Sequence, residues 1–133
     1  MKKTFKILLS LLFISTLLSA SYGAAESYKD ISPRQVKNML NKGKKGVMLL
    51  DVRTSGEYKT GHLKNSILIP IQVLEKRINE ISAFKDKELI IYCAVGGRSS
   101  RAATYLTNNG FNKVYNMSGG INAWSRLGYE IEQ

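Results

Sequence analysis

Short runs of mostly apolar residues, separated by segments with helical apolar spacing, limit the fold of this chain more than any other feature. The runs are Val47–Leu50, Ser66–Ile69 and Leu89–Tyr92. Each has the length of a β-strand, and continuous apolarity is typical of a strand buried on both faces of a parallel sheet. The pattern therefore predicts an α/β domain with a central parallel sheet of about five strands, flanked by helices on both faces.

Capping residues and apolar spacing place the helices. Ser32, Pro33 and Gln35 have the order of a helix N-terminus: a hydroxyl cap, a proline at the first helical position and a glutamine three residues after the cap. Gly110 follows another helical segment and favours a left-handed C-terminal cap. The remaining expected elements are a helix over residues 73–81, a helix from Ser99 to Asn109, a strand at Lys113–Asn116 and a last helix from Gly119-Gly120 through Trp124.

The first 24 residues have the three-part pattern of a secretory signal peptide. A basic start precedes a mostly apolar stretch over residues 7–18, and small residues follow as far as Ala25. The apolar stretch is shorter than the roughly 20 residues of a membrane-spanning helix, and an uncleaved anchor is the alternative. Small residues offer a cleavage point near Ala20 or near Ala24. We expect removal of residues 1–24, with the cut between 20 and 25, which leaves residues 25–133 as one domain.

The chain is basic, with 20 Lys and Arg against 10 Asp and Glu. Residues 1–24 contain three of these basic residues and none of the acidic ones, so their removal lowers the formal charge from +10 to +7. This charge either steers small anions toward the protein or simply keeps a secreted domain in solution. The lysines are scattered and not massed beside aromatic residues, so the sequence does not indicate a nucleic-acid-binding module.

Cys93 is the only cysteine, and it directly follows the strand predicted at Leu89–Tyr92. Cysteines of exported proteins normally pair in the oxidising compartment that they enter, but a single cysteine cannot form an intramolecular disulfide. The thiol is therefore either a small buried apolar group or a reactive one. The two glycines, the arginine and the helix start that follow favour the reactive group.

The loop Cys93–Arg98 has the composition of an anion cradle. Backbone N–H groups in a curled loop and at a helix N-terminus attract negative charge, and the same field lowers the pKa of a thiol. Gly96 and Gly97 allow positive φ angles and close backbone approach. Arg98 either contacts the substrate or binds carbonyl groups of the loop. Ser99 is either a helix cap or a hydroxyl donor to the sulfur.

Several segments in order resemble the signatures of rhodanese-type domains. The loop Cys93–Arg98 matches the six-residue active-site loop of that family. Residues 114–124 are similar to its terminal signature. The segments similar to its first signature are Asp51-Val52-Arg53, Glu57-Tyr58, Gly61-His62-Leu63 and Ile69-Pro70. The resemblance covers essentially residues 28–129 and implies a single, exported rhodanese-like domain.

This resemblance implies a sulfurtransferase. Cys93 would attack the outer sulfur of a donor such as thiosulfate, become a persulfide and pass the sulfur to an acceptor such as cyanide or a thiol. Covalent transfer in two steps has ping-pong kinetics. Loop amides would stabilise the persulfide anion as an oxyanion hole does. The resemblance implies no metal and no organic cofactor. The residues that it assigns to the substrate cradle are Ala94, Val95, Gly96, Gly97 and Arg98, with Ser99 beside them.

The residues around the loop match positions with mainly structural roles in the family. Asp51 and Arg53 would support the site through hydrogen bonds that fix loops. His62, the only histidine, is expected to make a structural hydrogen bond and not to act as a catalytic base. Asn65 stands where the family usually has glycine, and asparagine tolerates left-handed backbone. Trp124 is expected in the core.

The length and composition of the loop also limit the possible substrates. Four residues separate Cys93 from Arg98, whereas related cysteine phosphatases have a longer loop, so this ring suits a sulfur atom better than a phosphate group. Ala94 and Val95 carry no positive charge, whereas some thiosulfate-using relatives have basic residues there. A persulfide or another thiol compound is therefore a candidate donor beside thiosulfate.

Two other interpretations remain open beside the enzyme. One is a non-catalytic module that uses the loop to bind an anion or a protein, and the other is a thiol redox or persulfide carrier that serves another exported protein. We expect a monomer that is periplasmic or secreted and that meets the membrane only during export. The expected partners are a small sulfur donor and a thiol or cyanide acceptor, and not nucleic acid.

Overall fold

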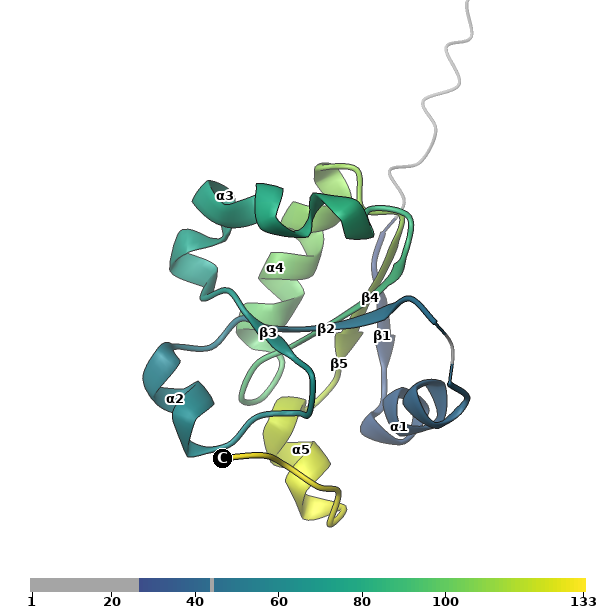
Figure 1. Cartoon of the computed structure of the whole chain (residues 1–133), viewed down its shortest axis with the longest axis vertical. Helices are drawn as coiled ribbons and strands as arrows, with labels where there is room; N and C mark the ends of the chain where they lie inside the picture. Colours follow the sequence, from purple (N-terminus) through teal and green to yellow (C-terminus); the bar gives the residue numbers. More distant parts are fainter. Residues whose placement is uncertain (1–26, 44) are drawn as a thin grey trace, which may run out of the picture.

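The computed structural model describes residues 27–43 and 45–133, so the predicted signal peptide lies outside the described residues. The described chain forms a five-stranded parallel sheet with the strand order β1-β5-β4-β2-β3 (Figure 1). This confirms the predicted fold class. The strands are β1 (Lys29–Ile31), β2 (Val47–Asp51), β3 (Ile67–Leu68), β4 (Glu88–Tyr92) and β5 (Lys113–Met117).

Helices cover both faces of the sheet, with α3 and α4 on one side and α1 and α5 on the other (Figure 1). Short 3-10 helices flank α3. The α-helices are α1 (Pro33–Asn41), α2 (Ser55–Thr60), α3 (Leu74–Arg77), α4 (Gly97–Asn108) and α5 (Gly120–Arg126), and the 3-10 helices are η1 (Ile71–Val73) and η2 (Ile78–Phe84).

The alternation of side chains along β4 divides the core into two layers. Leu89 and Ile91 pack on the α4 side, whereas Ile90 and Tyr92 pack on the α1 and α5 side, and all four side chains are fully buried. Cys93 is the next residue in this alternation, and it joins the α4 layer. The strand therefore delivers the thiol to the side of the sheet where α4 begins.

The helix predicted after Ser32 is present with both of its capping hydrogen bonds. The Gln35 N–H donates to Ser32 Oγ at 3.3 Å, and the Ser32 N–H donates to Gln35 Oε1 at 2.8 Å. The left-handed geometry expected at Asn65 and Gly110 is also present, with φ of 62° and 87°.

The structure corrects several expected elements. The single helix predicted over residues 73–81 is instead the succession of η1, α3 and η2. No side-chain cap starts any of these three, and the burial of Leu74 and Ile81 holds the segment in place. The strand predicted at Ser66–Ile69 shortens to β3, an edge strand whose Ile67 is exposed. β1 and α2, which are both short, have no counterpart among the elements predicted from the sequence.

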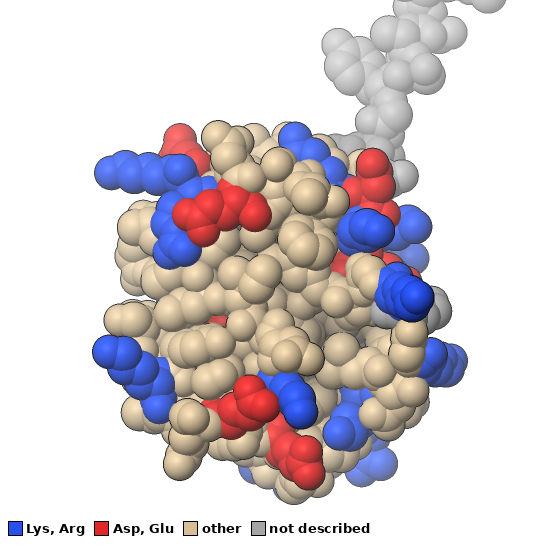
Figure 2. All heavy atoms as spheres, viewed as in Figure 1, with Lys and Arg blue, Asp and Glu red and all other residues tan. Residues whose placement is uncertain are grey.

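Charged side chains of both signs are interspersed around the face shown in Figure 2, and the centre of that face is largely uncharged. This distribution agrees with the scattered lysines of the sequence. Within residues 27–43 and 45–133, no helix is both long and apolar enough to cross a membrane.

Candidate active site

The loop after β4 bends around the sulfur of Cys93. Gly96 adopts φ of 113°, a left-handed conformation that favours glycine, and this residue caps the N-terminus of α4. The bend brings the Gly96 N–H to 3.1 Å from Cys93 Sγ, and Ser99 Oγ lies 3.3 Å from the same sulfur. The side chain of Cys93 is almost completely buried, so the loop encloses this sulfur atom closely.

The N-terminus of α5 holds the outer side of this loop. The Ile121 N–H donates to the Cys93 carbonyl at 2.9 Å, and the Asn122 N–H donates to the Ala94 carbonyl at 3.1 Å. Carbonyl and N–H point in opposite directions across a trans peptide, so the N–H of Val95 faces away from α5. Its hydrogen bond to the thiolate helps to lower the pKa of Cys93.

This contact explains the pair of glycines before α5. A Cβ on Gly120 would overlap the backbone of Cys93 and Ala94. Gly120 also has φ of 58°, which side chains rarely adopt. The terminal signature therefore supports the site through the close approach of the Gly120 backbone to the backbone of Cys93 and Ala94.

Opposing influences act on the pKa of Cys93. Burial is the largest and favours the neutral thiol, but the Ser99 hydroxyl and the N–H groups of Ser99, Gly96 and Val95 favour the thiolate. Together these donors prevail and hold the pKa below the ordinary value of 9.0. The reactive interpretation of Cys93 is therefore the one that the geometry supports, since a thiolate is the nucleophilic form.

Ser99 is not the cap of α4. Gly96 holds the capping position, and Ser99 lies within the first turn with its side chain fully buried. Its hydroxyl reaches both Cys93 Sγ and the Gly96 carbonyl, the latter at 3.1 Å. Of the two roles expected from the sequence, donation to the sulfur is the one that the structure shows. The cap role is wrong because α4 begins at Gly97, two residues before the start predicted at Ser99.

Arg98 makes a contact that sequence reasoning did not foresee. Its guanidinium donates two hydrogen bonds to the Glu57 carboxylate on α2, at 2.8 and 2.7 Å, across 41 residues of chain. The pair is partly exposed, with 26% of the Arg98 side chain and 34% of the Glu57 side chain accessible. These hydrogen bonds are the main reason that the pKa of Glu57 falls to about 2 and that the pKa of Arg98 rises.

Glu57 belongs to a segment that resembles the family signature, but the sequence assigns it no role. A capping box formed by Thr54 and Glu57 is a local signal that could have placed this residue on a helix. The Thr54 N–H donates to Glu57 Oε2 at 3.0 Å, and the Glu57 N–H donates to Thr54 Oγ1 at 3.2 Å. The pairing with Arg98 has no comparable local signal.

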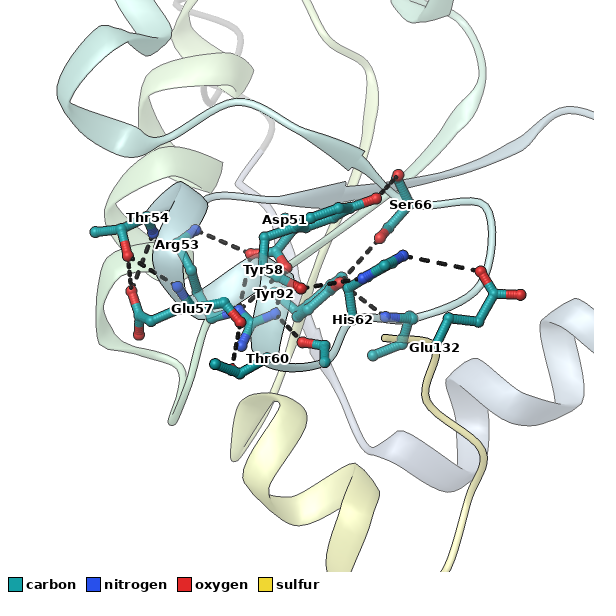
Figure 3. Close-up of polar contacts among 12 residues, drawn as sticks. Asp51, Arg53, Thr54, Glu57, Tyr58, Thr60, His62, Ser66, Tyr92 and Glu132 are labelled. Carbon is teal, nitrogen blue, oxygen red and sulfur yellow. Dashed lines mark hydrogen bonds and ion pairs between the residues drawn. The ribbon is translucent and has the colours of Figure 1, made fainter.

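Asp51 and Arg53 form a buried ion pair beside the site (Figure 3). The Arg53 guanidinium donates to both oxygens of Asp51, at 2.7 Å for the shortest bond, and to the Gly61 carbonyl at 2.6 Å. The pair therefore ties the end of β2 to the end of α2. This geometry supports the loop-fixing role that was expected for both residues.

The contacts of His62 are with Tyr58 and Glu132 and not with Cys93. Its ring stacks on Tyr58 with 3.8 Å between centroids, and Nδ1 lies 3.1 Å from the Tyr58 carbonyl. Nε2 lies 3.8 Å from the Glu132 carboxylate (Figure 3). These contacts are structural, and they fasten the C-terminal residues to the first signature. Trp124 lies in the core as expected.

No group of three or more His, Cys, Asp or Glu side chains that could hold a metal ion occurs in the part of the chain that the structure describes.

Comparisons with known proteins agree with this geometry. The model of the rhodanese-like domain family matches residues 32–127, so the chain belongs to the rhodanese-like domain family. A sulfurtransferase of Allochromatium vinosum is 39% identical over 85 residues, which cover 64% of this chain and 78% of that protein. The crystal structure of a rhodanese-like domain protein from Staphylococcus aureus has 35% identity and a TM-score of 0.69, with 79% of this chain and 99% of that chain covered.

A third relative combines such a domain with other sequence. The tRNA uridine(34) hydroxylase of Escherichia coli is 36% identical over 87 residues, which cover 62% of this chain but only 25% of the hydroxylase. The similarity therefore concerns one part of that larger protein.

Proposed function

We propose that the protein is a sulfurtransferase that carries a sulfane sulfur as a persulfide on Cys93. The observation that carries this proposal is the loop around the Cys93 sulfur, in which a buried thiol receives hydrogen bonds from the Gly96 N–H and the Ser99 hydroxyl. These donors stabilise negative charge on sulfur, both in the attacking thiolate and in the persulfide that follows. The curated sulfurtransferase among the relatives supports the same class of activity.

The reaction would proceed in two transfers. The Cys93 thiolate attacks the outer sulfur of the donor, a new S–S bond forms, and the old bond of that sulfur breaks with its electron pair leaving on the donor. With thiosulfate the leaving group is sulfite, and with a persulfide it is a thiolate. An acceptor nucleophile, cyanide or a thiolate, then attacks the outer sulfur of the persulfide and regenerates the Cys93 thiolate.

Intact mass spectrometry tests the proposal directly. The protein without residues 1–24 is incubated with thiosulfate or an organic persulfide, and its mass is expected to rise by one sulfur atom. Cys93→Ser removes the nucleophile and is expected to remove this gain. Cyanide is then expected to return the loaded protein to its original mass. A protein that gains no sulfur from any donor would contradict the proposal.

A second candidate is a binding module, in which the loop holds an anion or a protein without transferring sulfur. Val95 of the loop is 66% exposed, so a partner that docks on the loop would cover an apolar side chain. Partner capture that survives Cys93→Ala, in a protein that transfers no sulfur, would support this candidate over the enzyme. A disulfide-linked partner on Cys93 without persulfide would instead support the redox carrier.

We also propose that the chain is exported to the periplasm or secreted, with residues 1–24 as its signal peptide. The basic start, the short apolar stretch and the small residues near position 24 support this. The proposed partners are a small sulfur donor and a thiol or cyanide acceptor, for a monomeric protein.

A further inference from the structure

The ion pair between Arg98 and Glu57 is the part of the site that the sulfur chemistry above leaves unused. We propose that Glu57 is a specificity-determining residue: by neutralising Arg98 it selects the hydropersulfide of an organic thiol as donor over the dianion thiosulfate. This inference rests on the proposed function and names its donor class.

The segment from Cys93 to Arg98 contains no unpaired cation. Ala94 and Val95 are uncharged, and Arg98 is the one cationic residue of the segment from Cys93 to Arg98. Both of its terminal nitrogens are engaged by the two oxygens of Glu57. A paired guanidinium presents little net charge to a third group, so an incoming anion meets an almost neutral rim.

The groups that most favour the Cys93 thiolate are a hydroxyl and backbone N–H groups, which are neutral. Arg98 also attracts the sulfur, but its guanidinium is shared with the Glu57 carboxylate. The dipoles of the neutral groups act at hydrogen-bond distance and stabilise the charge of a single bound sulfur. They contribute much less to a second charge farther out, where Coulomb attraction from a cation would be needed.

The two donor classes differ in that outer charge. Thiosulfate brings a dianion toward a thiolate and toward the Glu57 carboxylate, and the only cation of the segment from Cys93 to Arg98 is already paired. A hydropersulfide carries at most one negative charge at its reacting end, and its organic part can lie on the exposed Val95. In the transfer, the Cys93 thiolate bonds to the outer sulfur, the S–S bond of the donor breaks, and the organic thiolate leaves with the electron pair.

The pKa of Glu57, lowered to about 2 by its bonds with Arg98, separates this role from acid–base catalysis. A carboxyl group that is ionised throughout the neutral range is a weak base for an acceptor thiol. Glu57 therefore acts on the reaction through the charge that it cancels.

Glu57→Gln tests the inference with little structural cost. Glutamine keeps the capping box with Thr54 and removes the negative charge, which frees the charge of Arg98. The ratio of kcat/KM for thiosulfate to kcat/KM for cysteine hydropersulfide is expected to rise about tenfold, a change that corresponds to about 1.4 kcal/mol. The change is expected as a lower KM for thiosulfate, and this difference in KM is expected to become smaller at high ionic strength.

Glu80→Gln is the matched control, since Glu80 forms the same kind of bidentate pair with Arg77 at 2.8 and 2.9 Å on an exposed surface. Its donor ratio is expected to equal that of the unmodified protein. An unchanged or lower ratio in Glu57→Gln, with its helical circular dichroism intact, would overturn the inference. So would an unmodified protein that prefers thiosulfate.

Mass spectrometry of Cys93 separates failure of this inference from failure of the proposed function. Loading by thiosulfate and persulfide alike, with no effect of Glu57→Gln, overturns the donor preference alone. A Cys93 that no donor loads overturns both. A protein-borne persulfide that loads Cys93 faster than cysteine hydropersulfide would identify the source of the same chemistry as a protein.

Discussion

At the scale of single residues, hydrogen bonds from neutral groups contribute most to the thiolate form of Cys93. The buried environment of Cys93 opposes ionisation, and the Ser99 hydroxyl with three backbone N–H groups reverses this effect. The one arginine of the loop, Arg98, also attracts the sulfur, but its guanidinium is paired with Glu57. The site therefore depends on the position of short-range donors, and each of them should matter individually.

Ser99→Ala tests this dependence. The substitution removes the side-chain donor to the sulfur, so the pKa of Cys93 is expected to rise and the thiolate fraction at neutral pH to fall. Alkylation by iodoacetamide at neutral pH should slow about tenfold, as expected for one hydrogen bond to a charged group. The pH at which the alkylation rate is half-maximal should move upward.

Ser100→Ala is the control. It also removes a serine hydroxyl, but the Ser100 hydroxyl donates to the Gly97 carbonyl at 2.9 Å and not to the sulfur. Equal alkylation profiles for the two variants would show that the Ser99 hydroxyl does not favour the thiolate.

Sequence reasoning placed Cys93, the glycine bend and the supporting pair Asp51 and Arg53 correctly in space, because each follows from the end of a strand or from a short turn. It missed the partner of Arg98. That contact depends on where α2 packs after the chain has folded, and no spacing along the sequence reports a pairing across 41 residues.

At the scale of elements, three segments meet around the Cys93 sulfur: the end of β4, the start of α4 and the start of α5. The N-terminal N–H groups of α5 take up the carbonyls of Cys93 and Ala94, which leaves the N–H groups of the loop free for the sulfur. The short helix α5 thus orients the loop, although no side chain of α5 makes a hydrogen bond to Cys93 in the described chain.

Gly120→Ala is expected to damage this contact. The new methyl group would overlap the backbone of the loop and would stand on a residue with φ of 58°. We expect a loss of about 2 kcal/mol or more in the free energy of unfolding, measured by urea denaturation, together with altered alkylation of Cys93.

Gly56→Ala on α2 serves as the control for Gly120→Ala. Its new Cβ meets only Thr54 Oγ1, at an ordinary 3.9 Å, so its stability should be unchanged or slightly higher. Equal stability of both alanine variants would refute the proposed backbone approach at Gly120.

The elements that could be predicted were those with a strong period or a cap, such as β2, β4 and α1. The elements that could not are short. β1 has three residues, of which only Ile31 is buried, so its strand state comes from pairing with β5 and not from its own composition. The segment 71–84 has an amphipathic pattern, but without a cap its helical period gives way to the packing of Leu74 and Ile81.

At the scale of the whole molecule, β1 connects the first described residues to the core. It pairs with β5 from Lys29 to Ile31, and the Ser118 N–H donates to the Ile31 carbonyl at 2.9 Å. The Asn116 amide on β5 donates to Asp30 at 2.8 Å. The sheet edge beside the terminal signature is therefore complete only when the chain begins before Lys29.

This requirement constrains where a signal peptide can be removed. A protein that begins at residue 25 retains β1 and should match the unfolding free energy of the full chain. A protein that begins at residue 32 retains the Ser32 cap but loses β1, the burial of Ile31 and the partner of Asn116. We expect that protein to be less stable by about 3 kcal/mol or more, from the apolar burial and the buried amide left unpaired. Urea denaturation of the two proteins measures the difference.

Export of the full chain in a bacterial host tests whether cleavage of the signal peptide leaves β1 intact. The intact mass of the protein recovered from the periplasm should correspond to cleavage between residues 20 and 25, since a cut beyond Lys29 would remove β1. An unprocessed chain that stays with the membrane would support the uncleaved anchor instead, and one that stays in the cytoplasm would refute export. A mature form that begins beyond residue 31 and is as stable as the protein from residue 25 would show that β1 does not hold the sheet edge.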